Sequence, residues 1–133
     1  MDKATLVNEQ IDAGREFAEA FNDYQTVDVH FWLNPADSSE WKLYLASPAI
    51  NDSNLEVAYG EVLQLVGSGK QMWLDAFQIT LLNSNDALAI KVKELRDRHP
   101  AQIATRYNGS SIAGIPINAA YIYPPLRTTV AVR

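Results

Sequence analysis

The chain has no cysteine, and it has only two histidines among its 133 residues. Without cysteine it has no disulfides, no thiolate catalysis and no metal or cluster held by cysteine. No apolar run approaches the ~20 residues that a membrane-spanning helix needs, so we expect no membrane partner. The opening residues, MDKATLVNEQIDAGREF, lack a basic segment followed by an apolar core. We therefore expect no signal peptide and a cytoplasmic location.

Basic residues are scarce in the first half of the chain. Residues 1–66 carry twelve Asp/Glu against three Lys/Arg, a balance of −9, and residues 67–133 carry four against eight, a balance of +4. The two sum to the net charge of −5. This asymmetry predicts either an acidic interaction surface or two parts of the chain that neutralise each other. An acidic chain also argues against nucleic acid as a partner, because nucleic-acid binders present a basic footprint.

Length and patterning predict one α+β domain over residues 1–133, with the element order α-β-β-α-β-α-β-β-β. The sheet is expected to be largely antiparallel, with the helices packed on one face. The expected helices cover 3–22, the span between Asn51-Asp52-Ser53 and Gly67, and the span between Ser84-Asn85-Asp86 and Pro100. The expected strands cover 27–33, 41–47, 76–82, 103–107, 110–113 and 119–123.

The first two expected strands alternate apolar and polar residues, which predicts a hairpin with one covered face and one partly wetted face. With Leu33 opposite Trp41, Trp32 and Tyr44 share the second face. If that face is open, the two rings form an aromatic patch of the kind that partner proteins use. Burial under loops or the C-terminal tail is the alternative.

Two further β signals lie near the end of the chain. Asn108-Gly109 gives the strongest hairpin-turn signal in the sequence. The tail Thr128–Val132 is β-prone, and it could add an edge strand, pair with another copy as a homo-oligomer, or fray. Both signals favour a β-rich C-terminal part.

Three segments carry a shared core-strand pattern: Phe31-Trp32-Leu33, the run from Trp41 to Pro48, and Ala120-Tyr121-Ile122-Tyr123. Through these segments the chain resembles a group of small, uncharacterised bacterial α+β proteins. The resemblance implies a single domain and a bacterial origin. It carries no activity.

The first expected helix carries five carboxylates at spacings of 3, 4, 3 and 4, which are Glu9, Asp12, Glu16, Glu19 and Asp23. Such spacing places all five on one helix face, where each like-charge pair costs roughly 0.2–0.5 kcal/mol and only Arg15–Glu19 offers relief. The pattern predicts a docking face for a basic partner. One alternative is a merely solvated surface. The other is neutralisation inside the fold by the basic residues of the third helix, which are Lys91, Lys93, Arg96 and Arg98.

A second function class rests on Asp28, Glu40 and Lys42, which form D-x11-E-x-K. Metal-dependent nucleases use two carboxylates to hold Mg²⁺ and a lysine beside the activated water. In the expected hairpin, however, Asp28 lies about four residues along the strand from Lys42, which is too far for a shared metal at ~3.3 Å per residue. The two histidines, His30 and His99, supply no zinc set.

The sequence therefore favours a protein-interaction or regulatory module with no catalytic site, metal or cofactor of its own. Its docking surface is either the acidic helix face or the aromatic sheet face with Trp32 and Tyr44. The alternative is a small Mg²⁺-dependent nuclease that uses Asp28, Glu40 and Lys42.

Overall fold

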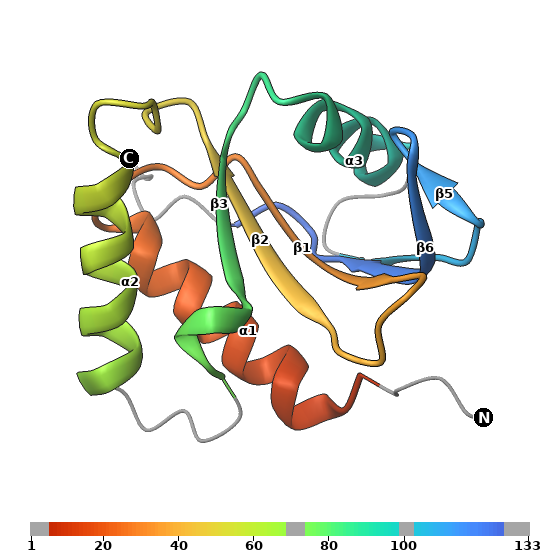
Figure 1. The fold of residues 1–133 in the computed structure, drawn as a ribbon, viewed down its shortest axis with the longest axis horizontal. Coiled ribbons are helices and arrows are strands. Elements are labelled where there is room, and N and C mark those ends of the chain that lie inside the picture. The colour runs from red at the N-terminus through yellow and green to blue at the C-terminus, as the bar shows by residue number, and fades with distance from the viewer. Residues whose placement is uncertain (1–5, 69–73, 99–102, 127–133) are drawn as a thin grey trace.

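A computed structural model describes residues 6–68, 74–98 and 103–126. The elements form one α+β domain, in the element order that the sequence predicted except for an additional short 3-10 helix (Figure 1). They are α1 (Asn8–Asn22), β1 (Val29–Pro35), β2 (Lys42–Ser47), α2 (Leu55–Ser68), the 3-10 helix η1 (Ala76–Gln78), β3 (Ile79–Asn83), α3 (Ala87–Asp97), β4 (Thr105–Tyr107), β5 (Ser111–Ile112) and β6 (Ile115–Ile122).

The strands form a mostly antiparallel sheet in the order β3-β2-β1-β6-β4, with β5 paired to β6. The exception is β3, which runs parallel to β2 because α2 carries the chain across between them. The outer edge of β3 is covered in part by α2, since the Leu81 amide donates to the Tyr59 hydroxyl at 2.9 Å. A covered edge is protected against pairing with other chains. The largely antiparallel sheet is thus confirmed.

Helices cover both faces of the sheet (Figure 1). On one face, α1 and α2 pack around Trp32, and on the other α3 packs around Phe31 and Leu33. The α+β class is confirmed, but α3 lies on the face opposite to the predicted one. The reason is that β1 is buried on both sides, including the polar side chains of His30 and Asn34. A strand buried on both sides needs a helical layer on each.

The pairing of β1 with β2 differs by one residue from the predicted register. Leu33 lies opposite Lys42 instead of Trp41. Because side chains alternate along a strand, a slip of one residue moves every side chain of one strand to the other face. Trp32 and Tyr44 therefore lie on opposite faces of the sheet.

The last hairpin turns at Ala113-Gly114, so the prediction of a hairpin at Asn108-Gly109 is wrong. Ala113 and Gly114 both have positive φ, 51° and 81°, as the two-residue turns of hairpins require. The strands that flank Asn108-Gly109, β4 and β5, both pair with the longer strand β6. The segment between them is closed locally, because the Tyr107 hydroxyl donates to the Ser111 carbonyl oxygen at 3.0 Å.

Two further predictions concern the C-terminal tail and the relation of the chain to a membrane. The tail Thr128–Val132, with its predicted pairing to another copy, lies outside the described residues, and so does His99. Among the residues that the structure describes, no helix is long and apolar enough to cross a membrane.

A buried polar contact fixes α1 on the sheet. Trp32 Nε1 donates to the Tyr123 hydroxyl at 2.8 Å, and that hydroxyl donates to the Ile11 carbonyl oxygen of α1 at 2.6 Å. Burial raises the pKa of Tyr123 well above its usual range, so the hydroxyl stays protonated and able to donate. Gly14 makes this approach possible, since a Cβ there would lie 2.5 Å from the Tyr123 oxygen and 2.9 Å from Trp32 Nε1.

The substitution Gly14→Ala is expected to lower the free energy of unfolding by about 2–4 kcal/mol, because the added methyl displaces the Trp32–Tyr123 contact. The matched control is Gly60→Ala in α2, where a Cβ meets no atom within 4 Å and alanine should stabilise by about 0.5–1 kcal/mol. Urea denaturation of both variants measures the difference. Equal stabilisation by the two alanines would contradict the packing described.

Candidate functional site

The acidic face of α1 is defined by five exposed carboxylates, Glu9, Asp12, Glu16, Glu19 and Asp23. They share the helix side that points away from the sheet, because the opposite side buries Gly14 and Phe17. Arg15, the one basic residue of α1, pairs with Asp12 at 3.1 Å, where the spacing had suggested Glu19. Exposed pairs of this kind contribute little, and the face stays strongly negative.

The C-terminal end of α1 carries negative charge where a helix disfavours it. Glu19 lies in the last turn and Asp23 is the C-cap, and the last turn has no basic residue. A helix presents partial negative charge at its C-terminus, so each acid there costs typically 0.3–1 kcal/mol. Only Glu9, in the first turn, lies at the favourable end. The acidic face therefore lowers the stability of the fold.

The basic residues of α3 do not neutralise the acidic face, so that alternative from the sequence is wrong. The helix α3 lies across the sheet from α1, and three of its four cations have partners on their own side. Lys93 pairs with Asp28 at 3.1 Å, and Lys91 with Glu94 at 3.8 Å. The buried guanidinium of Arg96 reaches the Asp28 carbonyl oxygen at 2.8 Å and Asp97 at 3.0 Å.

The predicted aromatic docking face is not assembled, which corrects the assignment of Trp32 as a partner-binding residue. Trp32 is fully buried between the sheet and α1, and its indole nitrogen is occupied by Tyr123. Tyr44 is half-buried on the other face and stacks on Phe31, with 5.1 Å between the ring centroids. The two rings cannot form one surface, because the observed register separates them.

The structure also separates Asp28, Glu40 and Lys42. Lys42 pairs with Leu33, five residues along the chain from Asp28, which corresponds to about 16 Å. The Asp28 carboxylate is held by Lys93, and Glu40 lies exposed in the loop before β2. Within the described ranges, no group of three or more His, Asp or Glu residues could hold a metal ion. The geometry gives the nuclease alternative no assembled site.

His30 is a buried titratable residue whose position the sequence did not predict. Its side chain is 2% exposed and stacks on Tyr123, with ring centroids 4.5 Å apart. Burial, and then the positive charge of Arg96, lowers the pKa of His30 to about 3. The imidazole is therefore neutral near pH 7 and packs as an aromatic core residue.

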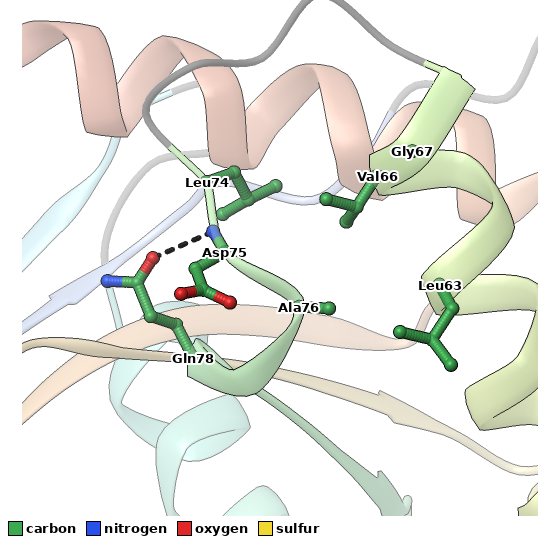
Figure 2. A pocket seen from close by; sticks show the side chains of 7 residues that line it. All are labelled: Leu63, Val66, Gly67, Leu74, Asp75, Ala76 and Gln78. Atoms are coloured by element: carbon green, nitrogen blue, oxygen red, sulfur yellow. Dashed lines mark hydrogen bonds between the residues drawn. The ribbon is translucent and has the colours of Figure 1, made fainter.

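A pocket of about 580 Å³ lies between the C-terminal part of α2 and η1 (Figure 2). We call it the α2–η1 pocket, and among the described residues it is lined by Leu63, Val66, Gly67, Leu74, Asp75, Ala76 and Gln78. In Figure 2, the side chains of Leu63 and Val66 on α2 face those of Ala76 and Leu74. The sequence did not predict this site, because its walls come from segments with no shared motif.

Phe77 next to the pocket corrects a further prediction. The sequence predicted a strand over 76–82, but residues 76–78 form η1 and the side chain of Phe77 is 88% exposed. The cause is the capping of η1: Asp75 Oδ1 accepts the Phe77 amide, and the Gln78 side chain accepts the Asp75 amide, each at 2.9 Å. The 3-10 turn delays β3 until Ile79 and turns Phe77 outward.

Comparison with known proteins adds no relative: no family model, curated protein or solved structure matches the chain. The resemblance to small bacterial α+β proteins therefore stays a prediction. The function has to be argued from the geometry of the chain itself.

The buried neutral His30 predicts an acid-sensitive fold. In the unfolded chain His30 titrates near pH 6.5, whereas in the folded chain it stays neutral down to about pH 3. Its contribution is present above pH 6.5 and is lost as the pH falls, by about 2 kcal/mol between pH 7 and pH 5. Chemical denaturation at both pH values, compared with His30→Phe, measures it. Parallel losses in wild type and variant would show that His30 is not the cause.

The acids at the end of α1 predict a stabilised variant. Glu19→Gln with Asp23→Asn should raise the free energy of unfolding by about 0.5–1.5 kcal/mol, because it removes like-charge pairs and charge opposed to the helix dipole. Asp37→Asn with Glu40→Gln changes the net charge equally in an exposed loop and should stay within about 0.5 kcal/mol of wild type. Thermal denaturation at low salt compares them, and a destabilised helix variant would contradict the interpretation.

Proposed function

We propose that the chain is a protein-interaction module of the bacterial cytoplasm that docks a basic partner through the acidic face of α1. The observation that carries this proposal is the concentration of exposed carboxylates on α1, while Lys91 and Lys93 of α3 are paired on the opposite face of the sheet. A surface that is kept at a cost to stability is typical of a functional site.

The dimensions of the acidic face describe the partner. From Glu9 to Asp23 the helix rises by about 21 Å, at ~1.5 Å per residue. A basic helix or extended segment of similar length can therefore meet all five carboxylates at once. Complementary charge of this kind mainly speeds association, and salt weakens it.

The test is capture from host-cell extract on immobilised protein, with proteins identified by mass spectrometry. Asp12→Asn, Glu16→Gln and Glu19→Gln together should reduce recovery of a specific partner about tenfold, and rising salt should release it. The matched control, Asp37→Asn, Glu40→Gln and Asp52→Asn, removes three exposed charges from loops and should leave recovery unchanged.

The outcomes separate specific docking from bulk charge. Loss with the α1 variant alone supports the proposal. Equal loss with both variants shows that net charge is responsible and overturns it. Equal retention by both, or no protein enriched on the wild type, overturns it as well.

A further inference from the structure

Two exposed apolar side chains belong to the segments that form the α2–η1 pocket. Leu63, which lines the pocket, is 58% exposed, and Phe77, which lies in the sequence between the lining residues Ala76 and Gln78, is 88% exposed. Scattered apolar residues need no explanation, but apolar side chains grouped beside a pocket of this size mark a binding surface.

Charge limits what this surface can bind. In the described residues, the helical layer of α1, α2 and η1, with the flanking caps Asp23 and Asp75, holds eight carboxylates and one cation, Arg15. One of those carboxylates, Asp75, lines the pocket. A second copy that docked by the same layer would bring like charges together, which destabilises an interface. In that second copy, Lys93 and Arg96 would not offset the repulsion, because both side chains are bound within their own chain.

We propose that the α2–η1 pocket receives an apolar side chain from a basic segment of the partner protein. This inference rests on the proposed function, because the segment is the one that the acidic face of α1 attracts. The segment carries a large aliphatic or aromatic residue for the pocket, with Lys or Arg beside it to meet Asp75. The α1 carboxylates then set the association rate, and the buried side chain sets the dissociation rate.

The pocket wall on the η1 side is held rigidly in advance. Asp75 and Gln78 cap η1 through their side chains, and Gln78 Nε2 also donates to the Trp41 carbonyl oxygen at 3.3 Å. A wall fixed before binding loses little conformational entropy when a ligand arrives. The pocket is therefore suited to one buried side chain rather than to an adaptable contact.

Gly67 offers a direct test, because it lines the pocket and a Cβ there meets no atom of the described residues within 4 Å. The variant Gly67→Leu places a side chain in the pocket without disturbing the packing of α2. The matched control is Gly60→Leu, two turns earlier on the same side of the helix, where a Cβ also meets nothing within 4 Å.

The experiment selects a random-peptide phage library on the full chain and measures the affinity of synthesised winners by fluorescence anisotropy. We expect peptides with one large apolar residue flanked by Lys or Arg. Gly67→Leu should weaken their binding at least about tenfold, and Gly60→Leu by less than about twofold. Asp12→Asn, Glu16→Gln and Glu19→Gln together should slow association and reduce its dependence on salt.

Each of the other results contradicts one named part of the proposal. If the α1 variant weakens binding and Gly67→Leu does not, the pocket assignment fails and the proposed function stands. If Gly67→Leu weakens binding and the α1 variant does not, the acidic-face function fails. The proposed occupant is wrong if the selected peptides lack basic residues or if no peptide is selected. It is also wrong if the chain self-associates in sedimentation velocity and Gly67→Leu abolishes that self-association.

Discussion

The contact between Tyr123, Trp32 and the backbone of α1 sets the orientation of the helix on which the proposed function depends. Tyr123 reaches the Ile11 carbonyl oxygen only because Gly14 leaves room for its hydroxyl and for the Trp32 indole. At 3.6 residues per turn, Gly14 lies on the side of α1 opposite to the acidic face. The same close approach that buries the polar pair therefore turns the five carboxylates to solvent. A rotation of α1 would disrupt the core and the surface together.

The sheet keeps the two charge populations of the chain apart. α1 and α2 lie on one face, and α3, with its four flanking or internal cations, lies on the other. Of the α3 cations, Lys93 reaches back to the acidic half through Asp28, and Arg96 reaches the Asp28 backbone. The contacts between the α3 cations and the acidic half of the chain are therefore confined to Asp28, at the start of β1. The charge asymmetry between α1 and α3 is therefore an asymmetry between the two faces of the sheet, although Arg106 of β4 lies on the α1 face, 4.8 Å from the centroid of the Tyr121 ring.

Periodicity predicted the helices, most strands and the acidic face, because each of these is set by spacing within one segment. The features that the sequence did not predict depend on how segments meet. The slip of one residue between β1 and β2 reversed the relation of Trp32 to Tyr44, and neither strand pattern contains that information. The turn at Ala113-Gly114 competes with a stronger local signal at Asn108-Gly109 and prevails because β6 pairs with both β4 and β5. The α2–η1 pocket arises only when the end of α2 lies beside η1.

Steering and anchoring make different demands on a surface, and the proposed function assigns both to this helical layer. Carboxylates act over roughly 8–10 Å at physiological salt, so they need exposure and spacing more than exact fit. An apolar pocket acts only on contact, so it needs a fixed shape, which the capped 3-10 turn at Asp75 supplies. Because the cations of α3 lie across the sheet, the field of the molecule favours approach of a basic partner from the side that carries the pocket. A partner attracted by charge alone would leave quickly, and one held by the pocket alone would arrive slowly. The acidic face and the α2–η1 pocket belong to one helical layer, which is the physical reason to treat them as one proposed binding surface.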